Sequence, residues 1–202
     1  MPQAQLVEIE LELRGYSIVA RPTSQNELDI QLYGQEMDSD NAQDAQKVIS
    51  QLQHEGLAVK RSTSCAECMT CSQGCLIMPH ESTLEVQLDQ LMRAVSAAMH
   101  TTGEIVTLRF EHLGRPYSFL ARWEGSLGSS GYDYLRNRWE YGIDAPTEQL
   151  LAAIRTIPGV VKATTEPLQG MEMQVLDVFV SSGSTSLQNC LAEVVDLLAT
   201  SS

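Results

Sequence analysis

Hydrophobic and polar residues alternate in two early stretches of the chain, as they do in half-buried β-strands. In residues 6–13 apolar positions are separated by three glutamates, which predicts a strand with one buried and one solvated face. The same alternation returns in residues 28–32. The apolar positions are Val7, Ile9, Leu11 and Leu13 in the first stretch and Leu28, Ile30 and Leu32 in the second.

Four segments instead carry apolar residues at helical spacing, near residues 45–52, 84–99, 146–157 and 186–199. Glycine follows the first two segments at Gly56 and Gly103, and Pro158-Gly159 follows the third, as expected at helix ends. Ser82 and Glu85 form a capping-box pattern before the second. The pattern therefore predicts about four helices.

Further strands are predicted between these helices. A short strand is expected at residues 57–61, a hairpin at 106–123 around a turn at Gly114, and two strands at 160–165 and 171–180. The last changes its apolar phase between Val175 and Leu176, which predicts a bulge or a strand end buried on both faces.

The mixture of hairpins and helices predicts an α+β fold, a mixed and largely antiparallel sheet with about four helices packed on it. We expect an α+β domain in residues 1–124 and an aromatic, glycine-rich loop or linker in 125–143. Residues 144–202 should form a small α-β-β-α lobe or extend the same domain. Residues 84–123 and residues 146–180 share an α-β-β order of predicted elements, but no convincing sequence repeat relates them.

The chain has 202 residues, of which 43% are hydrophobic, so a packed core is feasible. Its formal net charge of −13 repels nucleic-acid phosphates and anionic membranes, and suits docking to basic partners. No apolar run approaches the roughly 20 residues of a membrane-spanning helix. The first residues carry glutamates and no basic region, unlike a secretory signal, so we expect a cytoplasmic protein whose thiols are reduced.

Four of the five cysteines lie close together, with the spacing Cys65-x2-Cys68-x2-Cys71-x3-Cys75. This spacing resembles the cluster-binding run of bacterial-type ferredoxins, in which C-x2-C-x2-C supplies three thiolates to one [4Fe–4S] cluster. The resemblance is confined to residues 65–75 and implies nothing about the whole fold. It implies a cofactor, with these four cysteines as its candidate ligands.

The run departs from the ferredoxin pattern at two points. Leu76 stands where a proline follows the fourth cysteine in ferredoxins, and there is no second four-cysteine run, so a two-cluster ferredoxin is excluded. A single cluster would take Cys65, Cys68 and Cys71 as ligands. The fourth ligand would be Cys75, or else Cys190, His80 or an external molecule. Cys190 also fits the apolar face of the last helix, where a buried structural cysteine is expected.

Other chemistry at the cysteines remains open. Zinc could bind there, although the insert is short for two normal C-x2-C knuckles. Reversible disulfide formation or soft-metal capture is a third alternative, and a loop of free thiols is a fourth. The sequence offers no direct support for a catalytic enzyme, because it contains none of the common nucleophile, phosphate-binding or metalloprotease motifs.

Residues 132–142, YDYLRNRWEYG, combine aromatic rings with arginines. Such a combination is typical of contact surfaces for protein partners, although capping of the core beside the 106–123 hairpin is the more common use of such rings. Nucleic acid is disfavoured because two arginines do not offset the acidity of the chain. The candidate partner-binding residues are Tyr132, Tyr134, Arg136, Arg138, Trp139 and Tyr141.

Two functions follow as hypotheses. The first is a small soluble iron–sulfur protein, with one [4Fe–4S] cluster, that transfers electrons or senses redox state or oxygen. The second is a non-enzymatic adaptor or regulator with a zinc-bound or metal-free thiol loop and a protein-binding aromatic and arginine surface.

Overall fold

The computed structural model describes most of the chain, and it divides into two compact units. One unit is Glu8–Ile105, here called the cysteine unit, and the other joins Met1–Val7 to Val106–Ser202, here called the C-terminal unit. Strands with helices in both confirm the predicted α+β class. The described residues are 3–13, 15–25, 27–34, 41–54, 56–61, 75–79, 84–100, 103–123, 134–143, 148–167, 174–181 and 187–201.

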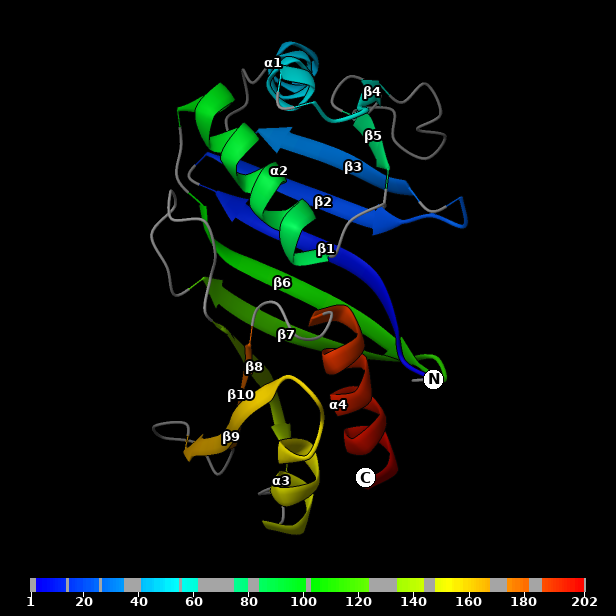
Figure 1. Cartoon of the computed structure of the whole chain (residues 1–202), viewed down its shortest axis with the longest axis vertical. Coiled ribbons are helices and arrows are strands. Elements are labelled where there is room, and N and C mark those ends of the chain that lie inside the picture. Colours follow the sequence, from blue (N-terminus) through cyan, green and yellow to red (C-terminus); the bar gives the residue numbers. More distant parts are fainter. Residues whose placement is uncertain are drawn as a thin grey trace. The chain divides into compact units, whose positions relative to one another are not determined.

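The cysteine unit is a strand meander followed by a helix, a strand pair and a second helix (Figure 1). Its strands lie in the order β4-β5-β3-β2-β1, and the pairs β1–β2, β2–β3, β3–β5 and β4–β5 are antiparallel. Helices α1 and α2 pack on each other, and α1 also contacts β3, β4 and β5. The elements are β1 (Gln5–Leu13, which begins before Glu8), β2 (Tyr16–Pro22), β3 (Glu27–Gly34), α1 (Asn41–His54), β4 (Lys60–Arg61), β5 (Cys75–Pro79) and α2 (Leu84–Met99).

The core of this unit forms where the apolar positions of the strands meet those of the helices. Alternation along β3 buries every second residue, and the apolar stripes of α1 and α2 are buried as well. Several of these positions were predicted from periodicity. They include Leu28, Ile30, Leu32, Ala45, Val48, Ile49, Leu52, Leu91 and Val95.

The C-terminal unit has the strand order β6-β7-β8-β10-β9, with antiparallel pairs β7–β8, β8–β10 and β9–β10. Helix α3 contacts β9 and α4. The elements are β6 (Gly103–His112, which begins before Val106), β7 (Arg115–Trp123), β8 (Tyr134–Ile143), α3 (Glu148–Arg155), β9 (Val160–Pro167), β10 (Gln174–Ser181) and α4 (Leu187–Ser201).

The two units share one connectivity, β-β-β-α-β-β-α, with the same order of strands in the sheet. Only a common α-β-β order is recognisable in the sequence, because the repeat lies in the pairing of strands and not in matched residues. By this correspondence β4–β5 is equivalent to β9–β10. The cysteine segment, residues 62–74, therefore joins the same two strands that the shorter connection 168–173 joins in the other unit.

Three strands were not predicted as such. Strands β2 and β5 were missed, and residues 134–143, expected within a loop or linker, form strand β8. Aromatic residues favour strands, but the glycines that precede this stretch drew the prediction toward irregular structure. The predicted bulge is confirmed, since the β10–β8 register shifts between Gln174 and Leu176.

One predicted face was also wrong. Val7 was expected on the buried face of the first strand, but it is 40% exposed, whereas Leu6 and Ile9 are buried. The buried phase thus changes between Leu6 and Ile9, at the boundary between the two units. Strict alternation cannot continue through a strand that contributes to two separate cores.

Candidate functional site

The cysteine segment is the connection of an antiparallel hairpin. Lys60 and Arg61 of β4 pair with Ile77 and Leu76 of β5, so residues 62–74 leave and return at adjacent strands. Of the four clustered cysteines, Cys65, Cys68 and Cys71 lie outside the described residues. The fourth, Cys75, is the first residue of β5.

The base of this hairpin is held by both helices of the unit. Gln53 of α1 donates from Nε2 to the carbonyl of Val59 (2.9 Å), just before β4. Gln87 of α2, which is buried, donates from Nε2 to the carbonyl of Pro79 (2.6 Å), the last residue of β5. The side chains of Leu76 and Met78 anchor β5 in the core. The two ends of the cysteine segment are therefore attached to fixed backbone.

Strand β5 also pairs with β3, and this places Cys75 directly opposite Gln31. The row continues across the sheet, because Gln31 is opposite Val19 of β2 and Val19 is opposite Glu10 of β1. Residues directly opposite each other in an antiparallel sheet share one face. Cys75 therefore occupies a position on the face that carries the polar residues of β1–β3, the face opposite the buried Leu28, Ile30 and Leu32.

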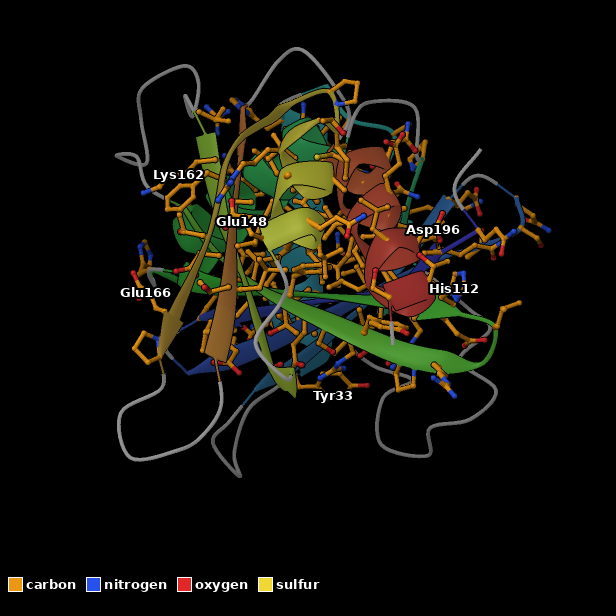
Figure 2. The ribbon with its side chains drawn as sticks, turned by 90° about the horizontal axis from the view of Figure 1, so that it is seen from below. Tyr33, His112, Glu148, Lys162, Glu166 and Asp196 are labelled. Atoms are coloured by element: carbon orange, nitrogen blue, oxygen red, sulfur yellow. The ribbon has the colours of Figure 1, made fainter. Side chains whose placement is uncertain are left out.

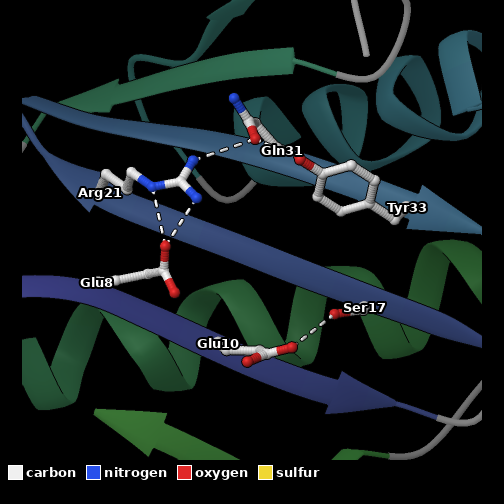
Figure 3. A network of polar contacts seen from close by, with 6 residues as sticks. All are labelled: Glu8, Glu10, Ser17, Arg21, Gln31 and Tyr33. Atoms are coloured by element: carbon white, nitrogen blue, oxygen red, sulfur yellow. Dashed lines mark hydrogen bonds and ion pairs between the residues drawn. The ribbon is translucent and has the colours of Figure 1, made fainter. Parts of the chain in front are cut away.

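A network of polar contacts on this face centres on Arg21 (Figure 3). Arg21 Nη2 lies 2.7 Å from Glu8 Oε2, and Arg21 Nη1 donates to Gln31 Oε1 (3.2 Å). The hydroxyl of Tyr33 donates to the same Gln31 oxygen. These contacts hold the side-chain amide of Gln31 from two neighbours, at the register position opposite Cys75.

Asp29 is the exception in this network, because one of its oxygens has no partner. Asp29 is opposite both Arg21 and Ile77, yet the hydrogen bonds and ion pair of Arg21 described above go to Glu8 and Gln31. Asp29 Oδ1 is buried without a hydrogen bond. Burial raises the pKa of this carboxyl, and the charge of Arg21 opposes that shift only in part. Asp29, a carboxyl that holds its proton more strongly than usual, thus lies two residues along β3 from Gln31, the residue opposite Cys75.

His80 and Cys190 were the predicted alternatives to Cys75 as the fourth ligand. His80 lies outside the described residues, whereas Cys190 is a buried cysteine on α4 of the C-terminal unit and forms no disulfide bond. Its burial agrees with the structural role expected of it. Within the ranges that the structure describes, no three His, Cys, Asp or Glu residues are grouped so that they could hold a metal ion. The predicted metal site therefore depends on the segment outside those ranges.

The predicted partner surface is mostly strand. Tyr134, Arg136, Arg138, Trp139 and Tyr141 belong to β8, and Tyr132 lies outside the described residues. Trp139 is opposite both Phe119 and Leu176, which are buried. Arg136 is three residues before Trp139 on the same strand, and an odd separation assigns its position to the other face of the sheet. The register thus divides the predicted set between two faces of the sheet.

A second polar cluster in the C-terminal unit ties the start of the chain to α4. Asp196 accepts hydrogen bonds from the backbone N–H groups of Gln3 (2.7 Å) and Ala4 (2.8 Å). The Nε2 atom of buried His112 lies 3.5 Å from Asp196 Oδ1, and Figure 2 shows the two side chains together. One carboxylate therefore joins the N-terminal residues, β6 and α4.

Gln31, Arg21, Asp29 and Asp196 were not among the predicted site residues. Asp29 and Gln31 were visible as the polar positions of a predicted strand, but their importance depends on which strand lies beside them. That information is long-range, and no local motif carries it.

No protein-family model matches the chain, and no curated protein matches it either. In the described part of the chain, none of the helices combines the length and the apolar character needed to span a membrane.

Proposed function

We propose that the chain is a small iron–sulfur protein that transfers electrons or senses redox state or oxygen. Its ligands are Cys65, Cys68, Cys71 and Cys75, and its cofactor is a single [4Fe–4S] cluster. The spacing of the four cysteines is the observation that carries the proposal, because such a run lets a short segment present thiolates to separate irons of one cluster.

The attachment of the segment supports this use. Both ends of residues 62–74 are held by one strand pair, and that pair is fixed to α1 and α2 through Gln53 and Gln87. A loop whose ends are already joined loses less conformational entropy when its side chains converge on one ligand. A soft, thiolate-binding cofactor fits a segment of this composition.

Cys75 is the favoured fourth ligand. It belongs to the same hairpin as the other three cysteines, and its backbone is fixed by pairing with β3. Cys190 is buried on a helix of the other unit, where an apolar environment suits a neutral thiol. In the cytoplasm, where thiols stay reduced, four such cysteines are available for a metal.

Cysteine variants test the proposal. In protein purified without oxygen, serine at any of the four positions should remove most of the visible absorbance and bound iron. Cys190→Ala should retain both and so controls for thiol loss. Iron and absorbance that survive all four serine substitutions would refute the ligand assignment, and bound zinc in place of iron would favour a structural site.

A further inference from the structure

The sheet of the C-terminal unit ends at β9, a strand of eight residues. β9 is the last member of the strand order, and among the described strands it pairs with β10 alone. Its exposed residues are Val161, Lys162, Glu166 and Pro167, and Val161 is exposed to 65%. The outer edge of such a strand presents backbone N–H and C=O groups that can pair with another chain.

The backbone groups of Ala163 and Thr165 point to the outer side of β9, away from β10. Arg155 of α3 donates from Nε (3.1 Å) and Nη2 (3.0 Å) to the carbonyl of Ala163, which places this carbonyl on the outer side. Pro167 is four residues further on and lacks an N–H, as a strand tolerates where the N–H would face away from the ladder. Alternate residues of an antiparallel strand direct their backbone groups to the same side, so Thr165, midway between, does so too.

The two charged residues near the centre of β9 lie symmetrically about Thr164. Lys162 precedes Thr164 by two residues, and Glu166 follows it by two. Successive side chains of a strand project to opposite faces, so these three positions share one face, whereas Ala163 on the other face is completely buried. The strand is therefore complementary in charge to an antiparallel copy of itself.

We propose that β9 pairs with β9 of a second copy of this chain, antiparallel and centred on Thr164. In this register Lys162 of each copy is opposite Glu166 of the other, and opposite charges at such positions stabilise a pair of strands. Ala163 of each copy is opposite Thr165 of the other, so the outward backbone groups exchange hydrogen bonds. Two-fold symmetry repeats each contact, and a second copy is the occupant that the charges of this edge specify.

Arg155 and Pro167 are compatible with this pairing. The carbonyl of Ala163 has two lone pairs, so it can accept the N–H of Thr165 of the second copy beside Arg155. Pro167 falls opposite Val161 of the second copy, where it offers a carbonyl and an apolar contact to the most exposed side chain of β9 that is aliphatic. Because the arrangement occupies the β9 edge of both copies, pairing through this edge stops at a dimer.

Sedimentation velocity of the full-length chain over a range of concentrations tests the inference, which does not depend on the metal proposal. The wild type should change from monomer to dimer as its concentration rises. Lys162→Glu places like charges opposite each other at both symmetric contacts, and Glu166→Lys does the same with the other sign. Each variant should weaken dimerisation about tenfold. A wild-type chain that stays monomeric at every concentration would overturn the proposal.

A mixture of the two variants separates a contact between copies from a change within one chain. One Lys162→Glu chain and one Glu166→Lys chain restore opposite charges at both contacts, so the equimolar mixture should dimerise within about threefold of the wild type. Arg115→Glu reverses the charge of an exposed residue of β7 and should leave dimerisation unchanged. A mixture as weak as the single variants, or an equal loss in Arg115→Glu, would refute the pairing.

A synthetic peptide distinguishes pairing with a second copy from capture of any extended segment. The peptide of residues 160–167 should compete with dimerisation, whereas the same peptide with Lys162→Glu and Glu166→Lys should compete about tenfold less well, because it presents like charges to the edge. Equal competition by the two peptides would show that the edge accepts strands of other proteins regardless of charge, and would contradict the proposed self-recognition.

Discussion

Gln31 and Cys75 occupy directly opposite positions of β3 and β5. The Oε1 atom of Gln31 accepts hydrogen bonds from Arg21 and from the hydroxyl of Tyr33, so its amide is oriented by two neighbours. The first residue of β5 is thus opposite a polar side chain whose orientation is fixed.

Changing Gln31 to leucine should lower the reduction potential of the proposed cluster. A polar amide at the position opposite a ligand cysteine stabilises the more negative, reduced state, and an apolar side chain there favours the oxidised state. A redox titration followed by visible absorbance measures the change. Tyr33→Phe should lower the potential by a smaller amount, because it loosens the amide without removing it. Gln46→Leu, at an exposed position of α1, is the control. A change in its reduction potential equal to that of Gln31→Leu would contradict the role of Gln31.

Replacing residues 62–74 with residues 168–173 should leave the cysteine unit folded. The shorter connection already joins the equivalent strands in the C-terminal unit, so the free energy of unfolding should change by only about 1 kcal/mol. The variant should lose all bound metal, because Cys65, Cys68 and Cys71 are gone. Urea denaturation and metal analysis measure the two effects. Loss of cooperative unfolding would show that the segment is needed for the fold.

Asp29→Asn should stabilise the protein at neutral pH. The raised pKa of Asp29 means that the native state binds its proton more strongly than the unfolded state, so its carboxylate opposes folding as pH rises through the native pKa. The difference from the wild type should therefore shrink as pH falls through the native pKa and level off below about 3.9, where both states are protonated. Urea midpoints across this range measure it. Glu12→Gln, an exposed change on β1, is the control, and the same pH dependence there would remove Asp29 as the cause.

Asp196→Asn should destabilise the C-terminal unit by about 1–3 kcal/mol, because the charged acceptor of the Gln3 and Ala4 amides is lost. The N-terminal residues should also become more sensitive to proteases. Glu193→Gln, an exposed change one turn earlier on α4, should shift stability by less than about 0.5 kcal/mol. Equal effects of the two variants would mean that α4 is sensitive to any charge change.

Local periodicity identified most of the helices and the buried residues of several strands. Leu28, Ile30 and Leu32 repeat with period two, and Leu150, Leu151 and Ile154 repeat at helical spacing, and all six are buried. Periodicity failed at Val7, where one strand passes between two cores, and at β8, where glycine-rich sequence precedes the strand. Both failures have the same cause, because contacts with distant strands determined the burial of Val7 and the formation of β8.

The relationships that define the candidate site are all long-range. The cysteine spacing could be read from the sequence, but the position of Cys75 opposite Gln31 and the unpartnered oxygen of Asp29 depend on strand register. Register is set by which strands pair, and no short motif encodes it. The chemistry of the segment was thus predictable, while its surroundings were not.

The most direct test of the central claim is the iron, sulfide and zinc content of protein purified and analysed without oxygen. One [4Fe–4S] cluster predicts about four irons and four acid-labile sulfides per chain, a brown colour and a broad visible absorbance band. A colourless chain that holds zinc, or no metal, under the same conditions would contradict the iron–sulfur assignment.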